Sequence, residues 1–153
     1  LSTDIPGTWQ TFAVLVFAYS TNRWLGLIAV FLYLILGYFG LPVFAEGSSG
    51  SDVLFGKTGG YLFGFLIGAF IVGSLGEKKM AGSFIKSLLA MAIGTAIILA
   101  TGVSWLAEFI GWANAFKYGL TPFLIGATIK IVFGAVVSLF YEWFTKYYSF
   151  KNE

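Results

Sequence analysis

The sequence contains no cysteine and no histidine among its 153 residues. Their absence excludes disulfides, thiol and imidazole nucleophiles, and the usual ligand sets for zinc, haem and iron–sulfur clusters. The sequence also lacks the complete phosphate-binding loop pattern Gly-x-x-x-x-Gly-Lys-Ser/Thr, because Ser51 stands where the first glycine before Gly56-Lys57-Thr58 would be needed. We therefore expect a protein that is not an enzyme and that carries no cofactor and no metal ion.

Charged residues are also scarce. Charged residues make up 10% of the chain, whereas hydrophobic residues make up 58% and aromatic residues 20%. This apolar share exceeds that of soluble domains and predicts an integral membrane protein. The net charge of +2, from scattered basic residues, excludes a nucleic-acid partner. A chain of 153 residues has room for about five or six spans of roughly 20 residues, which predicts one transmembrane domain over 1–153.

Hydropathy predicts about five membrane-spanning helices, interrupted at glycine, serine, proline and charged clusters. The predicted spans cover residues 9–19, 24–44, 61–75, 84–103 and 122–141, the first of them short. Residues 104–118 form a weaker segment that includes Glu108, Asn114 and Lys117. This segment is too polar to span, so we expect it to lie along the membrane interface or to re-enter. The sequence thus predicts an all-α bundle.

The charges of the connecting loops predict the orientation, because cytoplasmic connections are enriched in lysine and arginine. The turn with Arg23 and the connection 77–86, which is rich in lysine, are therefore placed inside. The connections around 46–57 and 108–117 are not enriched and are placed outside. This topology brings 5–11, 46–60, 104–119 and the start of the last helix to one outer face, where we expect a pocket.

Lys130 is the only charged residue in the apolar stretch 122–141. Eight helical residues from Pro122 place it about 12 Å below that end of the helix. Ionisable residues at this depth usually face the protein interior or a water-filled cavity. Small neighbours one turn away, Gly126, Ala127 and Gly134, leave room on the same face. We expect Lys130 to meet an anionic group; the alternative is that it snorkels to an interface or binds carbonyls of a neighbouring helix.

Other candidates at the predicted outer face have structural alternatives. Gly60, Gly64 and Gly68 recur every fourth residue, a pattern typical of close helix packing, although Gly60 also stands at a helix start that could bind an anion. Aromatic residues at this face form either a membrane-interface belt or a ligand wall: Trp9, Phe44, Tyr61, Trp105, Trp112 and Phe116. Three polar residues could either contact a ligand or cap a helix: Gln10, Thr11 and Asn114.

Separated motifs in the right order resemble the biotin-transporter (BioY) family. They read QTFA at 10–13, GLPVFA at 40–45, GKTGGYL at 56–62, and GLTPFL at 119–124 followed by Gly126 and Lys130. The resemblance runs from Ile5 to about Phe140. Members of this family are six-helix, biotin-binding S components of energy-coupling factor (ECF) transporters. They are multi-pass proteins of the prokaryotic plasma membrane, and they associate with a transmembrane coupling subunit and paired ATPases.

The resemblance implies a biotin-binding site with specific roles. Lys130 would bind the biotin carboxylate, and Tyr61 and Phe44 would wall the bicyclic ring. The candidates for polar contacts are Thr58, Gly60, Asn114 and Gln10. The implied partners are biotin, membrane lipid and the ECF subunits, with capture from the extracytoplasmic side.

The chain departs from the family pattern at several positions. Ile125 and Ala127 stand where the family usually has proline and aspartate, and Lys57 replaces a usual proline. The first family helix, with its small residues for docking the coupling subunit, has no counterpart, so we expect it to be missing here. Two alternatives follow: an S component for another small carboxylate vitamin, or a membrane scaffold protein in which Lys130 serves only helix packing.

Overall fold

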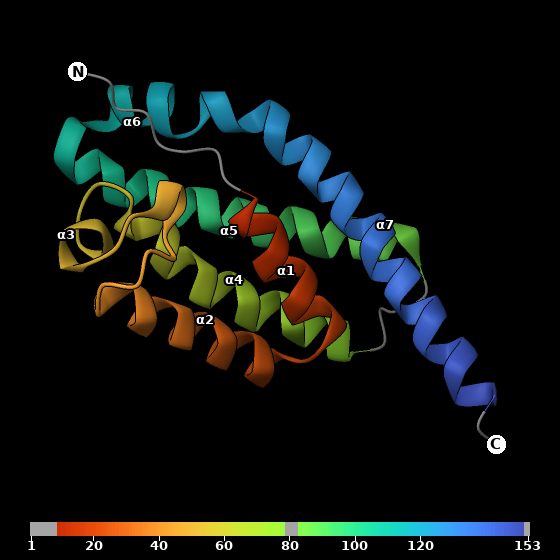
Figure 1. Ribbon diagram of the computed structural model, residues 1–153. Helices are drawn as coiled ribbons and strands as arrows, with labels where there is room; N and C mark the ends of the chain where they lie inside the picture. Colours follow the sequence, from red (N-terminus) through yellow and green to blue (C-terminus); the bar gives the residue numbers. More distant parts are fainter. Residues whose placement is uncertain (1–8, 79–82, 152–153) are drawn as a thin grey trace.

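The structure of the protein is a computed structural model that describes residues 9–78 and 83–151. Within these residues the regular elements are all helices, which confirms the predicted all-α class (Figure 1). In chain order they are α1 Gln10–Ser20, α2 Arg23–Tyr38, the 3-10 turn η1 Ala45–Gly47, α3 Ser51–Leu54, α4 Gly59–Glu77, α5 Phe84–Ile110, α6 Trp112–Gly119 and α7 Thr121–Lys151.

Helix α4 lies at the centre of the bundle and packs against α1, α2 and α5. Its sequence is apolar on all sides, which suits a helix that is surrounded by others. Helix α7 packs across α1 and α5 on the other side. The main core is formed by buried side chains of these helices, among them Leu15, Val72, Met91 and Ile98.

Three helices are long and apolar enough to cross a membrane by length and composition. They are α4, α5 and residues 121–149 of α7. Helices α1 and α2 are apolar but shorter, with 11 and 16 residues. The five predicted spans therefore correspond to five helices, of which the first is short, as the hydropathy indicates.

The turn between α1 and α2 is fixed to the end of α4. Asn22 caps α2, because its side-chain oxygen accepts hydrogen bonds from the backbone N–H groups of Trp24 and Leu25 at 3.0 and 2.9 Å. The Arg23 guanidinium forms a salt bridge with Glu77 at 3.1 Å, and the Arg23 backbone N–H donates to the same carboxylate at 2.8 Å. This end of the bundle is thus closed by polar contacts, away from the cavity described below.

The predicted second span is too long. Helix α2 ends at Tyr38 rather than at residue 44. Gly40 adopts a left-handed backbone conformation with φ of 100°, and Pro42 disfavours helical geometry at the residue before it. The prediction misses this break because residues 39–44 are mostly apolar. Residues 39–58 instead form an irregular loop with η1 and α3.

The predicted boundary at residue 103 is also wrong. Helix α5 continues to Ile110 and ends where Gly111 adopts a φ of 78°. Leu106 and Ala107 are buried in this extension, while Glu108 is exposed. One charge on the outer face does not end a helix whose other face is packed. Only the second half of the weak segment forms a separate short helix, α6.

The glycine stripe of α4 packs against α5, as predicted for Gly64 and Gly68. A Cβ atom at Gly64 would meet the Thr101 hydroxyl and lie 3.1 Å from the Ile98 Cα. Gly68 is less crowded, because its nearest neighbours are side-chain atoms of Ile98 at 3.3 Å. Gly60 has the same role, since a Cβ there would overlap Trp105.

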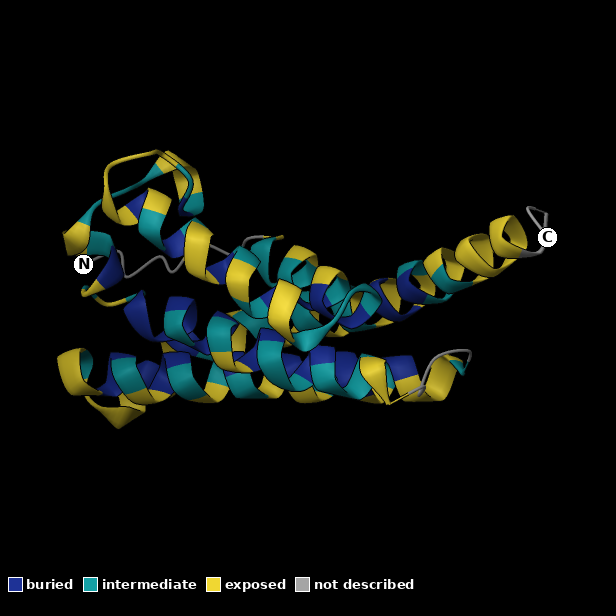
Figure 2. Cartoon of the chain, turned by 90° about the horizontal axis from the view of Figure 1, so that it is seen from below, coloured by how far each residue is buried: buried dark blue, intermediate teal, exposed yellow. Residues whose placement is uncertain are grey.

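The second half of α7 projects beyond the other helices (Figures 1 and 2). Its side chains from Tyr141 to Ser149 are exposed, apart from Glu142, which is half-buried. Exposed aromatic rings stack along this part, with centroids of Trp143 and Tyr147 5.7 Å apart. The first half of α7, by contrast, lies on the bundle and contributes to the site.

Candidate functional site

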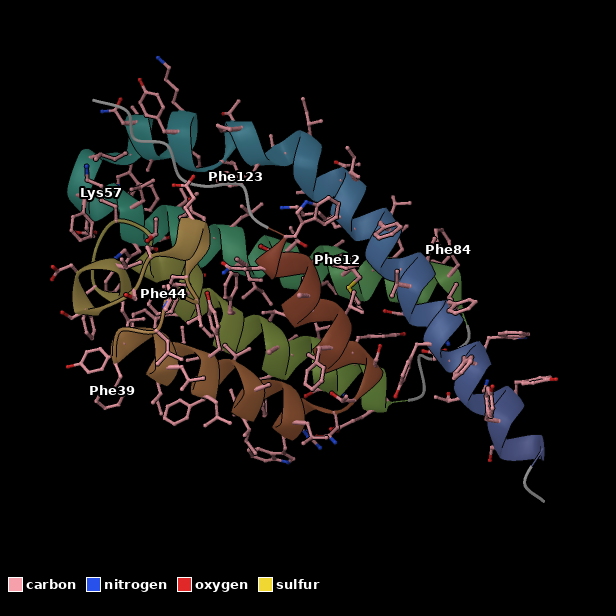
Figure 3. All side chains as sticks on the ribbon, viewed as in Figure 1. Phe12, Phe39, Phe44, Lys57, Phe84 and Phe123 are labelled. Atoms are coloured by element: carbon pink, nitrogen blue, oxygen red, sulfur yellow. The ribbon has the colours of Figure 1, made fainter. Side chains whose placement is uncertain are left out.

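A cavity of about 500 Å³ opens between α1, the loop 44–58, α4, α5 and α7. This volume falls in the range of sites for small organic molecules. Figure 3 shows Phe12, Phe44 and Phe123 on three of these elements, α1, the loop and α7. The segments come from nearly the whole length of the chain, so the cavity exists only in the folded bundle.

The cavity walls are mainly apolar. Lining side chains from α1, α4 and α5 are buried in the core: Leu15, Leu62, Phe65, Met91 and Ile98. A ligand that enters this part must therefore offer an apolar surface, since polar groups without partners would lose their hydration here.

Phe44 is a fixed part of the wall. Only 3% of its surface is exposed, its ring meets Tyr33 edge-on at 5.4 Å, and it fills the space left by the absent side chain of Gly37. The neighbouring loop residue Val43 is held in turn, because its carbonyl accepts a hydrogen bond from the Gln10 side chain at 3.1 Å. Gln10 thereby ties the start of α1 to the loop while lining the cavity.

Tyr61 connects the start of α4 to the corner between α6 and α7. Its hydroxyl donates a buried hydrogen bond of 2.7 Å to the carbonyl of Gly119. Its ring lies 6.0 Å from the Phe123 ring, centroid to centroid. The ring of Tyr61 lines the cavity while its hydroxyl is already used, so this residue offers a ligand an aromatic surface.

Lys130 lines the cavity together with Ala127, one turn earlier on α7. The expectation that Lys130 turns inward is confirmed, whereas its role in binding stays a prediction. Its ammonium lies 5.8 Å from the centroid of the Trp9 ring, within the range of a cation–π contact. An ammonium beside aromatic and apolar walls attracts an anion strongly, because low polarity strengthens the Coulomb interaction.

The loop side of the cavity carries exposed charges, Glu46, Asp52 and Lys57. Glu46 is held with a φ of 57°, and Thr58 donates a long hydrogen bond of 3.4 Å to the Val53 carbonyl. Being exposed, these charges are screened by salt far more than Lys130. They are placed to influence entry of a charged ligand more than its final binding.

Of the eight residues predicted for the site, six line this cavity. They are Gln10, Phe44, Thr58, Tyr61, Ala127 and Lys130. Gly60 does not line it, because it faces Trp105 on the other side of α4. Asn114 does not line it either: its side chain is exposed and donates to the Ile110 carbonyl at 3.0 Å. The predicted outer pocket thus receives no lining residue from 104–119, and its predicted residues 5–8 lie outside the described part of the chain.

Several contributors from α5 are not predicted by the sequence. Thr95 and Met91 line the cavity from the middle of this helix, but a single threonine in an apolar span carries little signal. Trp105 does not line this cavity. Its indole N–H donates to the Gly56 carbonyl at 2.9 Å and fixes the loop before Lys57.

An all-helical membrane bundle with an apolar cavity and an inward lysine defines a membrane-embedded protein with a cavity of the size that a small molecule fills. The comparisons with known proteins specify the family: the chain belongs to the BioY family, whose model matches residues 1–146. It is accordingly a multi-pass protein of the cell membrane.

Named relatives and a solved structure agree with this assignment. The chain is 43% identical to the biotin transporter BioY of Thermotoga maritima, over 88% of this chain and 79% of that protein. It is 36% identical to the biotin transporter BioY2 of Lactococcus lactis, over 88% and 75%. The crystal structure of an S-component for biotin from an ECF-type ABC transporter has the same fold, with a TM-score of 0.79 and 23% identity over 88% of this chain and 74% of that one.

Proposed function

We propose that this protein is a biotin-binding subunit of a vitamin uptake transporter and that it captures biotin from the extracytoplasmic side. The observation that carries the proposal is the cavity itself, in which Lys130 is combined with aromatic and aliphatic walls. Biotin is an anion at neutral pH with an apolar chain, which matches an ammonium in an apolar cavity. Relatives of this chain are named biotin transporters, which supports the same ligand.

The proposed roles follow the geometry. Lys130 binds the carboxylate, and the rings of Phe44 and Tyr61 enclose the bicyclic part. Gln10 and Thr58 supply polar contacts near the loop, and Ala127 leaves space beside the lysine. Gly60 and Asn114 take no part in this proposal, because neither lines the cavity.

Uptake requires energy that this subunit does not supply. The sequence contains no phosphate-binding loop. We therefore place ATP hydrolysis in partner ATPases, joined through a transmembrane coupling subunit, as in ECF transporters. The protein itself binds and releases biotin without changing it chemically.

Titration calorimetry of the purified protein with biotin tests the proposal. Lys130→Met should weaken binding by about 2–5 kcal/mol, because the carboxylate would lose its charged partner in a poorly hydrated site. Lys146→Met is the matched control, since Lys146 lies exposed on the projecting half of the same helix; it should bind as the wild type does. Absence of biotin binding by the wild type would refute the proposal and favour a membrane scaffold.

A second candidate is an S component for a different small carboxylate vitamin. It is favoured by Ala127, which lines the cavity where the family usually has aspartate, a group able to accept a hydrogen bond. Competition against labelled biotin distinguishes the two. Displacement of biotin by a lower concentration of another carboxylate vitamin would support this second candidate.

A further inference from the structure

Thr95 is a buried polar residue with an unusual environment. It lies in the middle of α5, is 7% exposed, and lines the cavity. Other threonines of the long helices donate to carbonyls of their own helix: Thr101 to Ile97 at 2.9 Å and Thr128 to Leu124 at 2.9 Å. Within the described residues the Thr95 hydroxyl makes no hydrogen bond.

The Thr95 oxygen is not one of the fully enclosed side-chain atoms without a partner, so it remains accessible from the cavity. Its immediate neighbours along α5 on the cavity wall are apolar. One turn before Thr95 stands Met91, and nearly one turn after it stands Ile98, both of which are 2% exposed and apolar. The hydroxyl therefore faces the cavity as a polar group that a bound molecule can satisfy.

Thr95 and Lys130 line the same cavity from two helices that pack together. Helices α5 and α7 run in opposite directions and pack together (Figure 1). A Cβ atom at Gly134 would lie 3.3 Å from the Met91 sulfur, so the Met91 side chain reaches α7 at this point. Thr95 is one turn beyond Met91 and Lys130 is one turn before Gly134, which places both one turn farther toward the loop end.

We propose that Thr95 is a specificity-determining residue whose hydroxyl donates a hydrogen bond to the ligand carboxylate that Lys130 neutralises. This inference rests on the proposed function. A carboxylate can accept about four hydrogen bonds, and a lysine satisfies only some of them. Apolar side chains also line this part of the cavity, among them Leu15, Met91 and Ile131. The charged end of the ligand is thereby held toward the inner part of the cavity, and its ring lies toward Phe44 and Tyr61.

Binding of biotin and of biotin methyl ester to Thr95→Val and Thr95→Ser provides the test. Valine keeps the shape of threonine and removes the hydroxyl, whereas serine keeps the hydroxyl. Thr95→Val should weaken biotin binding roughly 10- to 100-fold, the usual range for a hydrogen bond to a charged group. Thr95→Ser should stay within a few-fold of the wild type.

The methyl ester separates the carboxylate from the rest of the ligand. It should bind the wild type weakly, and Thr95→Val should change that weak binding little, because the ester carries no anionic oxygen for the hydroxyl. Thr128→Val serves as control, since Thr128 is exposed on α7; it should leave the binding of both ligands unchanged. Thr95→Ala provides a second hydroxyl deletion should the valine variant not fold.

The outcomes separate the two proposals. If the wild type binds biotin and the hydroxyl deletions bind it equally well, the inference about Thr95 is overturned while the proposed function stands. Equal losses for biotin and its ester would place the hydroxyl against another part of the ligand and would also overturn it. If the wild type does not bind biotin, both proposals fail.

Discussion

At the level of single residues, the inward position of Lys130 is predictable because a charge inside an apolar helix has few tolerable positions. Leaving an ammonium among lipid chains is costly, and this cost favours an inward side chain whatever the neighbouring helices are. Polar groups without charge are harder to place. Asn114 and Thr95 are both polar residues near apolar stretches, yet the first is exposed and the second is buried at the cavity.

Tyr61 shows how one side chain combines two functions that a sequence pattern does not separate. Its ring lines the cavity and its hydroxyl holds the Gly119 carbonyl. Tyr61→Phe should lower the free energy of unfolding by about 1–3 kcal/mol, because it leaves that buried carbonyl without its donor. Biotin affinity should change little, since the ring remains.

Thermal unfolding in detergent, followed by intrinsic fluorescence, measures this effect. Tyr38→Phe is the matched control, because Tyr38 is 46% exposed and its loss of a hydroxyl should not affect stability. Equal stabilities for the two variants would show that the bond to Gly119 contributes nothing measurable.

At the level of elements, the existence of the helices is predictable from hydropathy but their ends are not. Apolar residues 39–44 extend the predicted second span, although Gly40 and Pro42 end the helix earlier. The polar Glu108 suggests a boundary, although the buried side of α5 continues past it. Backbone conformation and packing on one face set these ends, and mean hydropathy reports neither of them.

The two glycines in the middle of α4 provide a prediction at this level. Gly64→Ala should lower the free energy of unfolding by about 1–3 kcal/mol, because the new methyl would press on Thr101 and on the backbone of Ile98. Gly68→Ala should change stability by less than about 1 kcal/mol, because its neighbours are side-chain ends and alanine favours the helix.

Unfolding of the two variants under identical detergent conditions gives the comparison. Each is the control for the other, since both lie on the same stripe and receive the same methyl group. A larger loss at Gly68 than at Gly64 would contradict the helix contact described for α4 and α5.

At the level of the whole molecule, the cavity joins α1, the loop 44–58, α4, α5 and α7. A ligand that contacts all these segments binds only the folded protein, so binding and stability are linked. Biotin at about 100 times its dissociation constant should therefore stabilise the protein by about 2.7 kcal/mol. This increase depends on the assembled site and not on any single helix.

Melting temperatures measured with and without biotin check this linkage. The wild type should melt at a higher temperature with biotin, and Lys130→Met should show little increase at the same concentration. Lys146→Met should respond as the wild type does. A wild type whose melting temperature does not rise at saturating biotin would contradict ligand binding at this cavity.

The class of this protein, its membrane location and its family all follow from the amino-acid sequence, because hydropathy, scarcity of charge and local motifs are properties of the chain. The inward position of Lys130 also follows from the sequence, since an ammonium that faces lipid chains is costly. The folded bundle was needed to show which polar residues face the cavity, where α2 and α5 end, and what Trp105 and Thr95 contribute. Those features depend on contacts between helices that are distant in sequence, and no local pattern encodes such contacts.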